Sequence, residues 1–108
     1  MPLRNVWAAS TTLDGSGGGE ASVVMRTGVQ VQHTRVSVGP APGASSVLKQ
    51  PRALICVNGV EFEGTHSGAS DQSATVYELA AGDVLVCRWA GGDPGAVARL
   101  WLRGVVLG

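Results

Sequence analysis

Histidines, cysteines and paired acids are the residues of this sequence whose chemistry could support catalysis. The two histidines, His33 and His66, lie far apart, and neither has a nucleophile and an orienting acid at a spacing typical of hydrolases. The segment around His66, Gly-Thr-His-Ser-Gly, does not match the Gly-x-Ser-x-Gly nucleophile elbow. We therefore predict that the protein is not an enzyme and that His66 is an exposed loop residue.

Two other patterns suggest chemistry but have simpler interpretations. Glu61 and Glu63 share one side of a predicted strand, as a glycosidase pair could, but two solvent-facing acids flanking an inward Phe62 explain them more simply. The run Gly15–Gly19 could cradle a phosphate, yet no Lys-Ser or Lys-Thr follows it and no helix is predicted there. We interpret it as a flexible loop.

The cysteines do not form a metal-binding pattern. Zinc sites use closely spaced pairs, whereas Cys56 and Cys87 each stand alone in a strongly apolar run. We expect no metal and no cofactor, and two buried free thiols. A disulfide remains open if the two strands are neighbours.

The elements that must position these residues are short strands. The chain has 108 residues, of which 44% are hydrophobic and 15% charged, so it should fold as one domain over residues 1–108. Valine-rich runs alternate with Gly, Pro, Asn and Asp, and no window has helical periodicity. We predict an all-β fold, an antiparallel β-sandwich that is jelly-roll-like, with about eight short strands and no substantial helix.

The strands are expected at Leu3–Ala9, Ala21–Arg26, Gly28–Val38, Ala53–Val57, Val60–Glu63, Ala74–Leu79, Val84–Ala90 and Val97–Arg103. A Gly/Ser loop over residues 10–19 follows the first, so residues 1–9 are either the first strand or an N-terminal arm. A change of apolar parity predicts a bulge near His33–Arg35. Asn58-Gly59 predicts a type I′ hairpin turn, and Gly64–Ser73 a polar loop.

The last strand carries the most informative surface. Ala98, Leu100 and Leu102 share one parity and should face the core, which directs Val97, Arg99, Trp101 and Arg103 outward. Tryptophan and arginine are enriched in protein interfaces, so we predict a subunit or partner contact at these four residues and Trp7. Alternatively, another part of the same chain covers Trp101. Trp89 is expected in the core, and Trp7 fits either location.

One half of the chain resembles a known group of proteins. It has a hairpin at Asn58-Gly59, a Gly-Thr-x-Ser-Gly loop, and a Gly-Asp turn into a strand that ends in Trp89. Gly-Gly-Asp-Pro-Gly-Ala and a closing strand follow. Over about residues 53–104 this pattern resembles small β-sandwich virion structural proteins of tailed bacteriophages, especially those that infect actinobacteria.

The resemblance implies a structural role. The expected function is that of a capsid decoration (minor capsid) protein, often a trimer, or of a small tail-associated protein. The implied partners are its own copies and the major capsid protein, and the implied location is the capsid surface of a virion assembled in the host cytoplasm.

Charge and hydropathy limit other partners. The formal net charge is zero, which argues against nucleic acid or an anionic membrane as a partner. No apolar run is long enough for a signal peptide or a membrane span. The alternative function is a carbohydrate- or receptor-binding module of a phage tail, in which Trp101 or Tyr77 would act beside Asp71 or Glu78.

Overall fold

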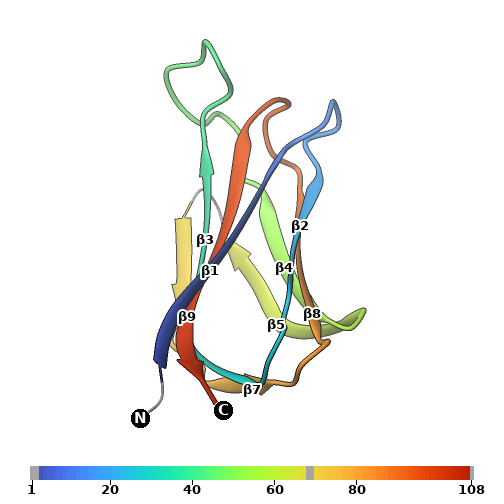
Figure 1. Cartoon of the computed structure of the whole chain (residues 1–108). Helices are drawn as coiled ribbons and strands as arrows, with labels where there is room; N and C mark the ends of the chain where they lie inside the picture. The colour runs from blue at the N-terminus through green and yellow to red at the C-terminus, as the bar shows by residue number, and fades with distance from the viewer. Residues whose placement is uncertain (1–2, 68–69, 108) are drawn as a thin grey trace.

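The computed structural model describes residues 3–67 and 70–107; for residues 3, 4, 63–67 and 70 it describes the backbone alone. The described residues form nine strands and no helix, and hence no helix that could cross a membrane (Figure 1). The strands are β1 (Leu3–Thr12), β2 (Gly19–Val24), β3 (Val29–Gly39), β4 (Arg52–Val57), β5 (Val60–Ser67), β6 (Ser70–Ser73), β7 (Tyr77–Leu79), β8 (Val84–Ala90) and β9 (Val97–Val106).

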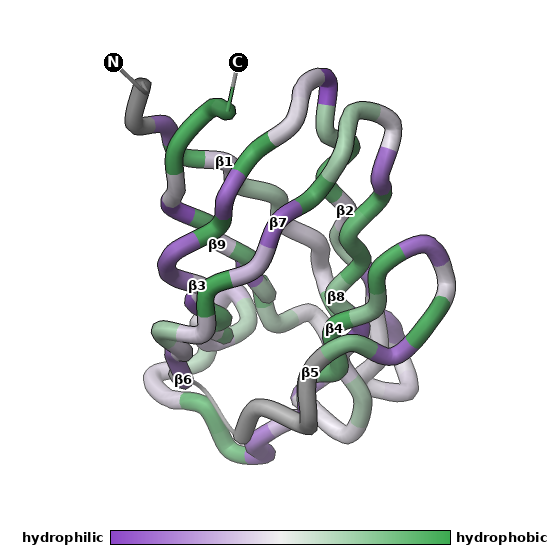
Figure 2. Tube along the Cα trace, turned by 90° about the horizontal axis from the view of Figure 1, so that it is seen from below, coloured by the Kyte–Doolittle hydropathy of each residue, from purple (hydrophilic) through white to green (hydrophobic). Residues whose placement is uncertain are grey.

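The strands form two antiparallel sheets. One has the order β1-β9-β3-β6, with β7 also pairing with β3, and the other has the order β2-β8-β4-β5. The pairs are nested, because β1 pairs with β9, β2 with β8, β3 with β6 and β7, and β4 with β5. This order, a long hairpin rolled into two sheets, is that of a jelly roll. Figure 2 shows the two layers facing each other.

Alternating side chains fill the space between the sheets. In β9, Ala98, Leu100 and Leu102 are fully buried, as their parity predicted. Trp89, on the inner side of β8, is only 2% exposed, which confirms its predicted place in the core. Burial of these apolar side chains, worth roughly 1.5–3 kcal/mol for each large one, holds the two sheets together.

Several strand boundaries differ from the prediction, including those of β1, β5, β6 and β7. β1 continues to Thr12, so the loop after it spans only residues 13–18, and residues 3–9 are a strand of the sheet rather than an arm. The expected loop Gly64–Ser73 contains the end of β5 and all of β6, whereas only Tyr77–Leu79 of the expected strand Ala74–Leu79 pairs. Each extra stretch is polar and lies in an edge strand, which needs only one buried face.

The hairpin between β4 and β5 has the predicted turn. Asn58 and Gly59 have φ values of 51° and 82°, the left-handed pair that a type I′ turn requires. The Asn58 side chain also donates to Asp83 Oδ1 at 3.0 Å and accepts from the Val84 amide at 2.9 Å. These bonds join the hairpin to the start of β8. The Asn58 amide, with the Ala80 backbone N–H, lowers the pKa of Asp83 below its usual value.

A bulge bends β3 close to its predicted position. In the β3–β9 ladder, Val31 lies opposite Gly104 but His33 lies opposite Arg103, so Gln32 is the extra residue. The backbones approach closely there, and a Cβ on Gly104 would overlap the Gln30 carbonyl oxygen. The bulge also changes which residues of β3 face outward beside Trp101.

Candidate binding surface

The outer side of β9 carries the predicted contact residues. Arg99 and Arg103 are exposed, Trp101 and Val97 are half-buried, and the residues between them face the core. Trp101 therefore lies on the outer face of the sheet, and Val97 lies near one end of it. No strand of the second sheet covers this outer face, because the second sheet packs against the opposite side.

β3 adds two residues that strand parity in β9 alone did not assign to this surface. Arg35 lies directly opposite Trp101, and His33 lies opposite Arg103. We call the set Arg35, Arg99, Arg103, His33 and Trp101 the cationic face. The signal for it was available: the parity that buries Val36 and Val38 directs Arg35 outward. Only the pairing of β3 with β9 places Arg35 beside Trp101.

Two groups already contact the indole of Trp101. The guanidinium carbon of Arg103 lies 5.9 Å from the centre of the ring, and the His33 ring meets it edge-on with centroids 5.8 Å apart. These are cation–π and aromatic contacts. Nδ1 of His33 is buried without a hydrogen-bond partner. The contacts fix the orientation of the indole on the sheet.

A hollow of about 380 Å³ lies beside Trp101. Its polar lining comes from Arg35, Arg99, Ser10 and Ser37, and its apolar lining includes Trp101 and Ala8. The hollow is wide because β1 presents only small side chains, Ala8 and Ser10, opposite Trp101 and Arg99. Guanidinium groups donate hydrogen bonds and accept none, so the charged lining favours a ligand with acceptor atoms.

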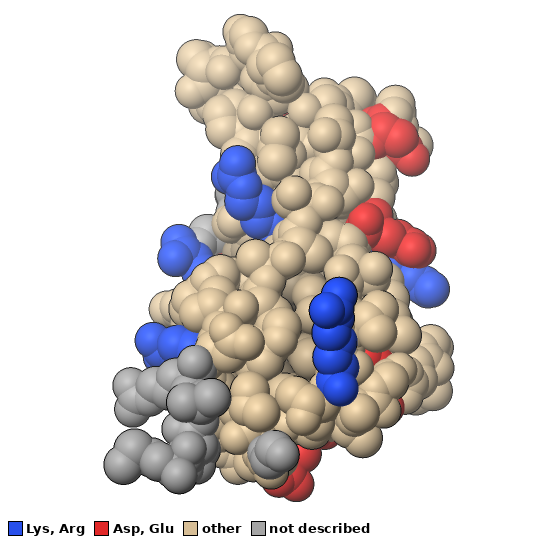
Figure 3. Space-filling model, viewed as in Figure 1, with Lys and Arg blue, Asp and Glu red and all other residues tan. Residues whose placement is uncertain are grey.

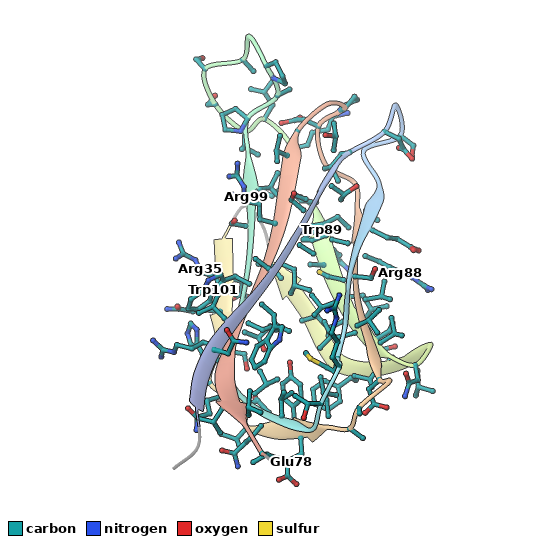
Figure 4. All side chains as sticks on the ribbon, viewed as in Figure 1. Arg35, Glu78, Arg88, Trp89, Arg99 and Trp101 are labelled. Atoms are coloured by element: carbon teal, nitrogen blue, oxygen red, sulfur yellow. The ribbon has the colours of Figure 1, made fainter. Side chains whose placement is uncertain are left out.

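Positive charge on this face is not neutralised by the side chains that the structure describes. Among the described side chains, no carboxylate forms an ion pair with Arg35, Arg99 or Arg103, whereas Arg88 on the other sheet binds Glu20 with an Nε–Oε1 distance of 2.9 Å. Figure 3 shows basic side chains along the left of this view, at its centre and at its right, whereas the acidic ones lie at the right and at the lower end. In Figure 4, Arg35, Arg99 and Trp101 lie together on one side, and Arg88 lies on the opposite side.

Trp7 does not join this surface. It lies opposite Leu102 in the ladder, faces inward and packs against the core while half-buried. Its neighbour Ala8 is the β1 residue that lies opposite Trp101. The structure thus places the two tryptophans on opposite faces of one sheet, and Trp7 contributes to the edge of the core instead.

One of the two aromatic residues considered for sugar binding, Tyr77, is buried. Tyr77 is 9% exposed, and its hydroxyl hydrogen-bonds with Thr34 Oγ1 at 3.0 Å inside the sandwich. Its ring packs against Phe62 with centroids 4.4 Å apart, and Phe62 is 40% exposed rather than fully inward. Glu78 is exposed but lies at the lower end of the molecule, away from Trp101 (Figure 4).

The glycine-rich loop is occupied by its own carboxylate. Oδ1 of Asp14 accepts hydrogen bonds from the Ser16 amide, the Ser16 hydroxyl and the Gly18 amide. The Ser16 hydroxyl contributes most to the lowered pKa of Asp14. Two amides that a phosphate would need are therefore already engaged.

The cysteines are free and buried. Cys56 lies opposite Val86 in the β4–β8 ladder and Cys87 opposite Ile55, so the two side chains point to opposite faces of the sheet. This geometry excludes the disulfide that the sequence left open. Burial raises the pKa of the Cys87 thiol to about 12.

The remaining candidates for chemistry do not form a catalytic or metal site that the structure describes. Within the described residues, no group of three His, Cys, Asp or Glu side chains could hold a metal ion. Glu61 is exposed, whereas the side chains of Glu63 and His66 lie outside the described part.

Comparison with known proteins adds no assignment. Neither the family models nor the curated proteins match this chain.

Proposed function

We propose that this protein is a non-enzymatic structural protein of a bacteriophage virion, most specifically a capsid decoration (minor capsid) protein. In this role it binds the outer shell, formed by the major capsid protein, and associates with its own copies, as a trimer. The observation that carries the proposal is the cationic face, where an outward tryptophan lies among three arginines that have no ion-pair partner among the described side chains.

The composition of the cationic face suits a protein contact. Tryptophan and arginine are the residues that contribute most to binding at interfaces, and guanidinium groups pair well with carboxylates. Like charges on one face repel each other, so an acidic partner gains more there than on a mixed surface. Symmetric self-association would also multiply weak contacts with a lattice.

The sequence pattern gives the proposal its virion context. The hairpin at Asn58-Gly59, the turn at Gly82-Asp83 and the segment Gly91–Ala96 carry the resemblance to phage virion proteins, and all three are turns of the jelly roll. The capsid surface is the corresponding location.

The test combines solution mass with particle binding. We expect light scattering after size-exclusion chromatography to give about three times the mass of the chain, and the variant Arg99→Glu/Arg103→Glu to lose binding to purified shells. Arg88→Gln, on the other sheet, is the matched control and should bind normally. Unchanged shell binding by the folded double variant would contradict the role of this surface.

A second candidate function is receptor binding by a phage tail, through a cell-surface carbohydrate. The specific observation in its favour is the hollow beside Trp101, whose volume of about 380 Å³ is within the range of small-ligand sites. A glycan screen tests it: specific binding that Trp101→Ala abolishes would favour this function over lattice docking.

A further inference from the structure

β1 is the outermost strand of its sheet and has β9 as its ladder partner on one side. In an antiparallel ladder, the N–H and C=O groups of alternate residues point toward and away from the neighbouring strand. The Val6 amide donates to the side chain of its neighbour Asn5 at 2.9 Å, and so points away from β9. By the same alternation, the backbone groups of Ala8 and Ser10 point to the open edge.

Those same two residues border the hollow. Ala8 lies opposite Trp101 and Ser10 opposite Arg99, with their small side chains on the outer face. Strands lie about 4.8 Å apart, so an added strand beside β1 would be two spacings from β9. A Glu or Asp side chain crossing the small residues of β1 could then meet the long guanidinium side chain of Arg99.

We infer that an extended acidic segment of a partner protein adds as a strand to β1 at Ala8 and Ser10. An Asp or Glu of that segment enters the hollow between Arg35 and Arg99, against Trp101. The inference rests on the proposed function, because it takes the cationic face as the docking surface, and it adds the binding mode and the chemistry of the partner.

The unpaired backbone groups at the open edge of β1 favour a peptide over other anions. The open groups of Ala8 and Ser10 include both donors and acceptors, which a peptide backbone matches and a phosphodiester, lacking donors, does not. The guanidinium groups of Arg35 and Arg99 then select a carboxylate. β1 of a second copy would supply the backbone but no carboxylate, because its sequence, Leu3–Thr12, contains no acid.

The first experiment uses model peptides with the full chain. A capped eight-residue peptide of alternating Thr and Glu is titrated at low salt, with Gln in place of Glu as the matched control. We expect binding about tenfold tighter for the Glu peptide, the usual gain from one charge-assisted pair. Amide exchange at Ala8 and Ser10 should slow on binding. N-methylation of alternate peptide amides should abolish both effects.

Variants separate charge recognition from strand addition. Arg99→Gln should remove the preference for Glu over Gln, and Arg88→Gln should not. Ser10→Pro, which removes an open-edge N–H, should weaken both peptides, and the N-methylated peptide tests the same point if that variant does not fold.

Three results would overturn the inference: equal affinity for the Gln peptide, binding without protection of Ala8 and Ser10, or tighter binding of a single-stranded oligonucleotide or a uronic-acid oligosaccharide. If shells bind through Arg99 and Arg103 but β1 is not protected, the strand addition fails and the proposed function stands. If the peptide binds as described but the arginine variants retain shell binding, the proposed function fails instead.

Discussion

At the scale of single residues, Gly104 has the least space of the described glycines within the sheets. It lies beside the bulge of β3, where a Cβ would meet backbone atoms of Gln30 and Val31 rather than a movable side chain. The backbone of β9 is paired with β1 on one side and with β3 on the other, so β9 cannot shift within the sheet to make room.

We therefore expect Gly104→Ala to lower the free energy of unfolding by about 2–4 kcal/mol, as overpacking against fixed backbone does. Chemical denaturation measures it. Gly15→Ala is the control, because a Cβ there meets nothing within 4 Å. Equal stability of the two variants would show that β3 moves to accommodate the methyl group.

The Cys87 thiol gives stability a dependence on alkaline pH. Its pKa is about 12 in the fold, because burial disfavours the thiolate, against 9.0 for the ordinary group. The unfolded chain therefore loses this proton first as pH rises, and the free energy of unfolding falls between about pH 9 and 12, by up to about 1.4 kcal/mol per pH unit.

Denaturation at pH 8 and 10 checks this, with Cys87→Ala as the comparison. The variant starts less stable, because it leaves a cavity, but its loss of stability over this range should be smaller. A native protein whose Cys87 reacts rapidly with a thiol reagent at pH 8 would contradict the burial.

Single residues were predictable from the sequence where strand parity decides their direction. Parity identified the outward Arg99, Trp101 and Arg103 and the buried Trp89. Parity could not show that Arg35 lies beside Trp101 or that Trp7 and Trp101 lie on opposite faces of the sheet. Both facts depend on which strands pair and in what register.

At the scale of elements, the β4–β5 hairpin has two functions in the fold. Its turn reverses the chain, and its Asn58 side chain links that turn to Asp83 and Val84 at the start of the neighbouring β8. The turn is therefore both a local reversal and a contact between elements distant in sequence.

Asn58→Ala should destabilise the protein by about 1–2 kcal/mol, because alanine tolerates the left-handed φ poorly and leaves both hydrogen bonds unmade. Asn58→Gly keeps the conformation and isolates the hydrogen bonds, and should cost less. Thermal unfolding of the two variants gives the comparison, and an alanine variant as stable as the wild type would mean that the turn relaxes to another type.

Elements were predictable where apolar alternation or a turn dipeptide marks them. The β4–β5 hairpin and β9 have such signals, whereas β6, Ser-Asp-Gln-Ser, has none and forms through its pairing with β3. The last residues of β1 are polar for a similar reason, since β9 supplies their hydrogen bonds. Local sequence contains no information on such pairings.

At the scale of the whole molecule, a formal net charge of zero conceals an uneven distribution. Net charge is only a sum, whereas strand pairing places Arg35, Arg99 and Arg103 on one face of the sheet. Figure 4 shows Arg35 and Arg99 on the same side of the molecule. The jelly-roll order creates this asymmetry by placing β3 next to β9, and the sequence predicted the fold class without that order.

This distribution predicts a small electrostatic cost of folding. Arg99→Gln should leave the free energy of unfolding within about 0.5 kcal/mol of the wild type. Any gain in stability should be seen at low salt and be absent at 1 M salt, where the Debye length is about 3 Å. Denaturation at two salt concentrations measures it. A large loss of stability would show that Arg99 has a structural role.

The pairing of β1 with β9 brings Leu3 opposite Val106, so the start of β1 and the end of β9 lie at the same pole (Figure 1). The loop after β3, over residues 40–51, lies at the other pole and has open space around Gly43. A short linker could therefore join the start of β1 to the end of β9 while new ends are opened in this loop. Such a circular permutant should keep the nested strand pairs. A protein fused to its new ends would lie at the pole of the loop over residues 40–51.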